Sequence, residues 1–334
     1  MARNRRWAAL SASLLVFLAA CAENAPQDTL EPQGPVARQI DKLMDPVFIV
    51  AGVIFVLVEG LVLFAVLKFR AKPDSPEPEQ IHGNTRLEVG WTLLPALILL
   101  AVAVPTIATI FDLGRKPDNA INVTVVGHQF WWEYRYEDLG VVTANELRMP
   151  VGQAVQLTLN SDDVIHSYWI PPLGGKQDVV PGRNNHMHLI ADEPGTYLGQ
   201  CAEFCGDSHA NMRARAIAMT PADFDAWVAS QRAPSVKASA GTAGEPGSLL
   251  FAQKGCGGCH TVEGVSEGKI GPNLSHFATR TTFAGSIFDN NDHNLRTWLR
   301  DPQAAKPGNK MVIPGAPLEP DEITELINYL NTLR

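Results

Sequence analysis

Residues 201–212 read Cys-Ala-Glu-Phe-Cys-Gly-Asp-Ser-His-Ala-Asn-Met, and this short stretch decides how the rest of the chain is interpreted. It places two thiols four residues apart, an imidazole four residues later and a thioether three residues beyond that. A second imidazole, His166, lies upstream. Thiolate, imidazole and thioether groups together suit copper better than hard cations, and two thiolates can bridge two metal ions. Structural zinc and a Cys201–Cys205 disulfide are the alternatives.

The residues around this stretch form short alternating segments separated by turn residues. Such segments predict an all-β module, a sandwich or Greek-key barrel, over residues 119–232. The clearest candidate strands are 121–126, 132–136, 154–159 and 186–190. His186 and His188 share one strand face, and we interpret them as ordinary polar strand residues because the donor set is complete without them.

Two apolar segments precede this module, at 46–69 and 91–111, and each is long enough to cross a bilayer. We predict a transmembrane helical hairpin over 46–113. An isolated Glu59 would be costly in lipid and therefore predicts a protein neighbour, whereas adjoining helices can accommodate prolines in the second span. Basic residues flank the connection and place it in the cytoplasm: Lys68, Arg70, Lys72 and Arg86.

The first 20 residues have the features of an export signal. Three arginines precede an apolar run, and Ala19-Ala20 stands directly before Cys21. This ending resembles a bacterial lipoprotein cleavage box, which would make Cys21 a lipidated amino terminus; an ordinary signal peptide cut near Ala20 is the alternative. Residues 21–45 then form an exported segment, and the modules after the hairpin lie on the outer side of the bacterial inner membrane.

The carboxyl-terminal module contains Gly255-Cys-Gly-Gly-Cys-His260, the pattern of covalent c-type haem attachment. Cys256 and Cys259 would form the thioether bonds, and His260 would present its imidazole to the iron. Met311 is the only methionine after His260 and is the predicted second axial ligand, with His276 and His293 as rivals. A thioredoxin-like redox pair and a zinc knuckle are the alternative readings of the motif.

Pro, Gly and small polar residues fill 233–247, which we interpret as a flexible linker. The haem module then covers 248–334, with helices expected at 248–253, 295–300 and 320–333.

The chain of 334 residues is long enough for several modules. Its 27 Lys and Arg against 35 Asp and Glu give a net charge of −8 without a long basic run, which disfavours a nucleic-acid partner.

The pattern Cys-x-Glu-x-Cys-x-x-x-His-x-x-Met, preceded by a distant His, resembles the binuclear copper (CuA) loop of cytochrome c oxidase subunit II. The resemblance implies that Cys201 and Cys205 are bridging thiolates and Met212 a weak axial ligand. It further implies imidazole ligation by His166 and His209 and ligation through the backbone carbonyl of Glu203. The Glu203 side chain, with Asp178, would serve a magnesium or manganese site shared with the catalytic subunit.

Two other segments carry the same resemblance. Gly-His-Gln-Phe-Trp-Trp-Glu-Tyr-Arg-Tyr at 127–136 is similar to the aromatic segment beside the copper, although Phe130 stands where many relatives have Trp. Trp131 or Trp132 would then carry electrons, or the fused haem domain would replace that route; core packing is the alternative role. Glu88, in Glu-Val-Gly-Trp at 88–91, matches the mouth of a proton channel, with a helix-start carboxylate as the alternative.

Taken together, these motifs resemble a caa-type oxidase subunit II: a multidomain membrane protein with a two-helix hairpin, a cupredoxin-like Greek-key barrel and an all-α class I cytochrome c domain. The resemblance implies electron flow from a donor, cytochrome c or a bc-type complex, to haem c, then to copper and to subunit I. Subunit I would reduce oxygen and pump protons, and subunit III is a further expected partner. The predicted spans contain no histidine, so this chain is not expected to reduce oxygen alone.

Three other functions are the alternatives to this one. A quinol oxidase subunit would lack the copper ligands, and all of them are present here. A copper-delivery assembly protein usually has Pro after the second Cys of its motif, whereas Gly206 follows Cys205. A nitric oxide or nitrous oxide reductase component also uses such a copper loop and stays open as the alternative function.

Overall fold

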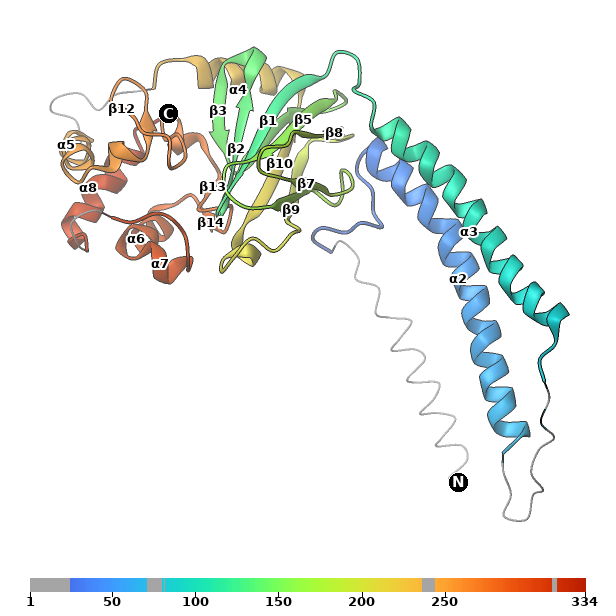
Figure 1. Ribbon diagram of the computed structural model, residues 1–334. Helices are drawn as coiled ribbons and strands as arrows, with labels where there is room; N and C mark the ends of the chain where they lie inside the picture. Colours follow the sequence, from blue (N-terminus) through green and yellow to red (C-terminus); the bar gives the residue numbers. More distant parts are fainter. Residues whose placement is uncertain (1–24, 71–79, 81, 236–243, 314–316) are drawn as a thin grey trace, which may run out of the picture.

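The structure is a computed structural model that describes residues 25–70, 80, 82–235, 244–313 and 317–334. Three parts follow one another: a helical hairpin, a β-domain (119–232) and a C-terminal domain (244–334). Figure 1 shows the hairpin projecting from one side of the β-domain and the C-terminal domain lying against another side. The predicted signal peptide and Cys21 lie outside the described residues.

The hairpin consists of α2 (Pro35–Lys68) and α3 (Thr85–Leu113). Both helices are long and apolar enough to cross a membrane. The most apolar stretch of each helix contains no residue that the rest of the described chain buries. The side chain of Asn84 caps α3 by accepting hydrogen bonds from the amides of Arg86 and Leu87 at 3.1 and 3.3 Å. The two predicted apolar helices are present, but α2 begins at Pro35 and continues through Pro46.

The amino end of α2 is attached to the β-domain. The Gln33 amide donates to the Pro172 carbonyl at 2.8 Å, and the Asp192 amide donates to the Gln33 carbonyl at 3.1 Å. Val36, the second residue of the helix, is buried, and Arg38 forms an ion pair with Asp192. The extra turns of α2 therefore belong to the contact with the β-domain and not to the apolar span.

The β-domain contains two five-stranded sheets. The first has the order β3-β2-β1-β5-β8 and comprises Val141–Ala144, Trp131–Tyr136, Ile121–His128, Val155–Ser161 and Asn185–Leu189. The second has the order β4-β10-β9-β6-β7 and comprises Glu146–Pro150, Arg213–Met219, Gly195–Cys201, His166–Trp169 and Gln177–Val179. The parallel pairs β1 with β5 and β4 with β10 join strands distant in sequence.

Inward-facing aromatic and aliphatic side chains form one continuous core in this domain. Trp132, Tyr134 and Tyr136 alternate along β2 and are almost completely buried, as the period of a strand requires. Helix α4 (Pro221–Arg232) covers the core with Phe224 and Trp227. This helix was not predicted from the sequence. Short 3₁₀ turns occur at Glu137–Leu139 and His209–Asn211.

The C-terminal domain is mainly helical and has its own core. Its helices are α5 (Glu245–Gln253), α6 (Asp292–Arg300), α7 (Pro302–Ala305) and α8 (Pro320–Leu330), with 3₁₀ turns at Cys256–Gly258 and Phe277–Thr279. Two short ladders pair β11 (Thr261–Val262) with β12 (Ser266–Glu267), and β13 (Thr282–Phe283) with β14 (Phe288–Asp289). On α8, Ile323, Leu326, Ile327 and Leu330 are buried, as the helical spacing predicted.

Candidate metal centres

The predicted copper donors are held at one end of the second sheet. His166 begins β6, Cys201 ends β9 and Met212 directly precedes β10. Strand β9 pairs with both β6 and β10, and the Cys201 amide donates to the Met212 carbonyl at 2.8 Å. Because the sheet fixes these three positions, only the intervening loop of 202–211 has to fold back to bring the remaining donors close.

The donors approach one another around the two sulfur atoms. The Sγ atoms of Cys201 and Cys205 are 3.9 Å apart, too far for a disulfide bond. His166 Nδ1 lies 3.9 Å from Cys201 Sγ, whereas His209 Nδ1 and Met212 Sδ lie 3.6 and 3.9 Å from Cys205 Sγ. The Glu203 carbonyl oxygen lies 3.2 Å from Cys201 Sγ. All six predicted donors are therefore brought together.

Asp163 orients one of these imidazoles, and it was not singled out from the sequence. The Nε2–H of His166 donates to Asp163 Oδ1 at 2.9 Å, which leaves Nδ1 facing the sulfur atoms. Burial raises the pKa of Asp163, but hydrogen bonds from His166, Lys310 and two backbone amides outweigh it and hold that pKa well below its usual range. A carboxylate three residues before a predicted imidazole ligand is the signal that could have identified it.

The two thiols are not equivalent. The neighbouring Cys205 side chain lowers the pKa of Cys201 most, burial opposes this, and His166 lowers it further. The same contact, together with burial, raises the pKa of Cys205, so without a metal the pair of thiols shares a proton on the Cys205 side. Gly206 follows with a φ of 130°, a conformation that favours glycine. Two thiols, two imidazoles and a thioether in buried or partly buried positions fit a soft metal such as copper.

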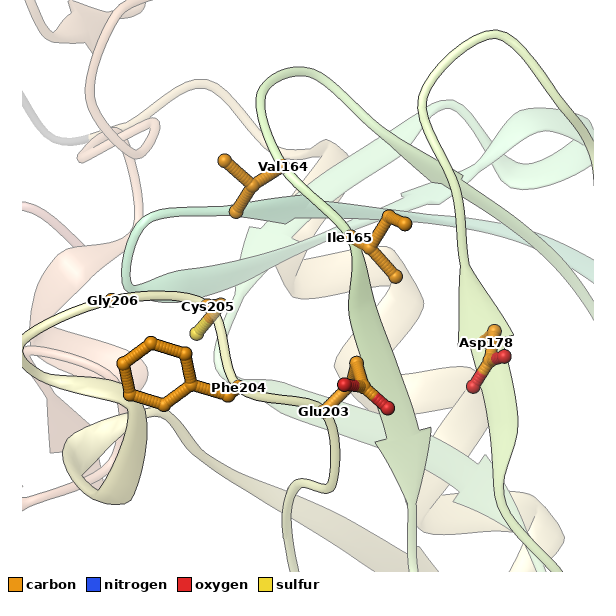
Figure 2. A pocket seen from close by; sticks show the side chains of 7 residues that line it. All are labelled: Val164, Ile165, Asp178, Glu203, Phe204, Cys205 and Gly206. Carbon is orange, nitrogen blue, oxygen red and sulfur yellow. The ribbon is translucent and has the colours of Figure 1, made fainter.

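A second group of oxygen atoms lies beside the sulfur atoms. Glu203, Cys205 and Asp178 line one cavity of about 550 Å³, together with Ile165 and Phe204. Figure 2 shows Asp178 on strand β7 and Glu203 on the loop that carries Cys205. Phe204 is 75% exposed and Ile165 is 47% exposed, which leaves an apolar rim around two carboxylates. The predicted Glu203 and Asp178 pair is thus brought to one cavity.

The predicted haem donors line another cavity, of about 350 Å³, which lies between the C-terminal domain and the β-domain. Cys256, Cys259, His260 and Met311 all face it, and its walls include Leu274, Phe283, Leu295 and Leu299. The two thiols are free cysteines. An apolar cavity that gathers two thiols, an imidazole and a thioether fits a covalently attached haem.

Both axial candidates are oriented by neighbouring groups. The Nδ1–H of His260 donates to the Pro272 carbonyl at 2.9 Å, so that Nε2 remains available for iron. A Cβ on Gly271 would lie 2.9 Å from His260 Nδ1, so that this glycine leaves room for the ring. Trp298 Nε1 donates to Met311 Sδ at 3.0 Å. Trp298 was not singled out from the sequence.

The other predicted residues take different positions. The rival ligands His276 and His293 are absent from the described walls of this cavity. Trp131 lines it and stacks on His128 with ring centroids 4.2 Å apart, whereas Trp132 is buried and its ring centroid lies 5.8 Å from that of His166. Glu88 is exposed in the first turn of α3, away from both centres.

Three family models match separate parts of the chain. The model described as the transmembrane domain of cytochrome c oxidase subunit II matches residues 27–109, and the model of its periplasmic domain matches 139–218. A cytochrome c model matches residues 244–334. These three matches follow the same order as the hairpin, the β-domain and the C-terminal domain.

Curated relatives resemble the chain over most of its length. Cytochrome c oxidase subunit 2 of Alkalihalophilus pseudofirmus is 40% identical over 329 residues, which cover 96% of this chain and 95% of the relative. The same subunit of Bacillus subtilis is 33% identical over 100% of this chain and 99% of its own length. A quinol oxidase subunit 2 of Bacillus cereus is 32% identical, over 66% of this chain and 77% of its own length.

These matches imply copper for the β-domain and haem c for the C-terminal domain, which agrees with the donor groups described above. Subunits of this kind are components of an oxidoreductase complex and associate with a catalytic subunit I. The chain belongs to the cytochrome c oxidase subunit II family, in the form that carries a fused cytochrome c domain.

Proposed function

We propose that the chain is the electron-entry subunit of a caa-type oxidase and that its two centres are a haem c and a binuclear copper site. When bound, these groups supply one-electron redox chemistry, by which the chain would accept electrons from a donor and deliver them to subunit I. The observation that carries the proposal is the convergence of six donors, two of which are thiol sulfur atoms 3.9 Å apart and the other four of which surround them.

The residues have distinct parts in this proposal. Cys201 and Cys205 would bridge the copper ions, with His166 and His209 as imidazole ligands. Met212 and the Glu203 carbonyl would complete the copper site. In the C-terminal domain, Cys256 and Cys259 would hold the haem covalently, and His260 and Met311 would be the axial ligands. Asp163 and the Pro272 carbonyl orient the imidazoles of His166 and His260.

A metal count with optical and EPR spectra of the purified full-length chain tests this proposal. We expect two copper ions and one iron per chain, with an EPR signal from an electron shared by both copper ions. Zinc in the β-domain, or a chain without bound haem after expression in a host competent for cytochrome c maturation, would contradict it.

Met311→His should lower the haem reduction potential, and an unchanged potential would exclude Met311 as a ligand.

The carboxylates of Glu203 and Asp178 support a magnesium or manganese site, since oxygen ligands suit both cations. We propose that subunit I supplies the rest of this site and covers the exposed Phe204 and Ile165. Glu203→Gln in the assembled complex should then reduce bound magnesium or manganese and leave the copper content unchanged. Equal loss of copper would instead show that the Glu203 side chain serves the copper site.

The proposed location is the bacterial cell membrane, with the β-domain and the C-terminal domain on its outer side. The two apolar helices and the basic residues at their connection support this topology.

Subunit III and a donor, cytochrome c or a bc-type complex, are the further proposed partners. Trp131, which lines the haem cavity, is the more direct candidate for electron transfer, and Glu88 is proposed for the entrance of a proton channel.

The alternative function is an electron-transfer subunit of a nitric oxide or nitrous oxide reductase. The same donor groups would serve it, so the acceptor used by the purified complex is the discriminating measurement. Oxygen consumption with a reduced donor supports the oxidase, whereas consumption of a nitrogen oxide alone supports the reductase.

A further inference from the structure

The β-domain carries a buried carboxylate whose partners come mainly from the C-terminal domain. Glu146, on β4, is 1% exposed. Its Oε1 accepts hydrogen bonds from the amides of Thr281 and Thr282 at 2.7 and 2.8 Å and from their hydroxyl groups at 2.5 and 3.1 Å. From its own domain, Arg148 donates to Oε2 at 2.9 Å. Without the C-terminal domain, Oε1 would lose all four of these donors.

The C-terminal domain carries a buried amine with the opposite arrangement. Lys306 follows α7 and is 2% exposed. Its Nζ donates to the Phe130 carbonyl of the β-domain at 2.6 Å and to the Ala284 carbonyl of its own domain at 2.8 Å. Each domain therefore contributes one buried ionisable side chain that is satisfied across the interface.

Further polar contacts connect the same two surfaces. The Arg213 amide donates to the Gly285 carbonyl at 3.0 Å, and the Ser208 hydroxyl donates to the Pro307 carbonyl at 2.5 Å. At the edge, the more exposed Lys310 pairs with Asp163 at 2.8 Å. These bonds add contacts at three further points of the interface, which restricts sliding of one domain on the other.

Burying an ionisable group without partners costs several times more free energy than a surface contact gains. A domain that was often undocked would repeatedly expose such groups or leave them without hydrogen-bond partners. Transient interfaces usually keep charged groups at their rim. Buried polar groups also fix how the two domains are oriented on each other, because any shift would leave these groups unpaired. We propose that Glu146 and Lys306 are positioning residues of an interdomain clasp that holds the cytochrome c domain on the β-domain in a single pose.

The clasp has a consequence for access. The haem cavity is lined by Phe130 and Trp131 of the β-domain as well as by the C-terminal domain. Phe130 is 3% exposed, and its carbonyl is bound to Lys306. With the clasp closed, a separate donor protein cannot contact the Phe130 ring, whereas Trp131 stays partly exposed. Only this consequence rests on the proposed function; the clasp itself concerns contacts between protein groups.

Hydrogen exchange of the full-length chain, loaded with both metals, tests the clasp. We expect the Thr281 and Thr282 amides to be protected at least ~100-fold, because both donate to a buried acceptor. Glu146→Gln and Lys306→Met should each lower protection in 280–286 by ~10-fold or more. Glu137→Gln, which changes an exposed carboxylate of the same domain, should leave it unchanged. Unprotected amides in the unaltered chain, or equal exchange in Glu146→Gln and Glu137→Gln, would overturn the proposal.

A double-mutant cycle separates positioning from a general loss of stability. If Glu146 acts through Thr282, Thr282→Val should change protection of 280–286 much less in the Glu146→Gln background than in the unaltered chain. Additive effects would contradict the clasp. Copper and haem spectra recorded on the same samples keep the two proposals distinguishable. Intact spectra with lost protection support the clasp, whereas protected amides in a chain without copper contradict the proposed function alone.

Discussion

The two candidate metal centres differ in how the chain assembles them. The donors of the β-domain lie on paired strands and one loop, within 3.9 Å of the nearest sulfur, and the sheets behind them have a complete core. The donors of the C-terminal domain are instead spread around a cavity of about 350 Å³. Copper would therefore be added to a folded domain, whereas haem would complete the core of its domain.

Removing haem attachment should give the largest effect. In the variant carrying both Cys256→Ser and Cys259→Ser, the C-terminal domain should lose several kcal/mol of unfolding free energy, since cavities cost about 24 cal/mol per Å³. The β-domain should stay folded. Calorimetry and hydrogen exchange of the full-length chain measure both. If removal of copper by a chelator destabilised the β-domain as strongly, the contrast between the two centres would be wrong.

A methyl group added beside His260 should have the next largest effect. Gly271→Ala places a Cβ 2.9 Å from His260 Nδ1, and overpacking of this kind costs about 1–3 kcal/mol. We expect a lower haem content or a changed axial-ligand spectrum. Gly258→Ala is the matched control within the attachment motif, because a Cβ there meets no atom within 4 Å. Equal effects of the two substitutions would mean that space around His260 is not the cause.

Met212→Leu should affect the copper centre locally. Leucine has nearly the same volume, so the stability loss should stay below about 1.5 kcal/mol, although the thioether is removed. The copper EPR and optical spectra should change while the haem spectrum stays the same. A chain that loses both signals although it is folded would show that the two centres are not independent.

The smallest expected effect concerns the environment of Met311. Trp298→Phe removes the Nε1–H that donates to Met311 Sδ, a loss of about 1 kcal/mol or less. The haem reduction potential should shift slightly and the copper spectrum should not change. Potentiometric titration of both centres in one sample detects this difference. A shift confined to copper would contradict the placement of Trp298 beside the haem.

The sequence predicted the parts of the molecule that depend on local patterns. The spans follow from apolar length, the β-domain from alternation, and the two motifs from spacing. The donor residues around Cys201 and Cys205 are close in sequence except for His166, and strand pairing brings His166 to them as the resemblance implied. Helix α4 was missed although Phe224, Trp227 and Val228 have helical spacing and Thr220 precedes a proline at the helix start, because the strand pattern was extended over the whole of 119–232.

Contacts between distant segments could not be predicted in this way. Glu146 and Thr282 have no unusual neighbours in the sequence, and only the docking of two domains makes their pairing visible. Asp163 and Trp298 likewise act through residues that the sequence did identify. In each case the two groups are close in space, but their separation along the chain follows no regular spacing that a sequence pattern could reveal.

Helix α2 runs from Pro35 to Lys68, and at 1.5 Å per residue its 34 residues extend roughly 50 Å, against about 30 Å for the hydrocarbon layer. Gln33, just before the helix, is hydrogen-bonded to the β-domain, and Arg38 in the first turn is ion-paired to it. In a membrane, the remaining length of the helix would therefore separate the β-domain and the C-terminal domain from the hydrocarbon layer. A tilt of the hairpin would swing these domains sideways over the membrane surface, which makes the tilt a determinant of how they meet their neighbours.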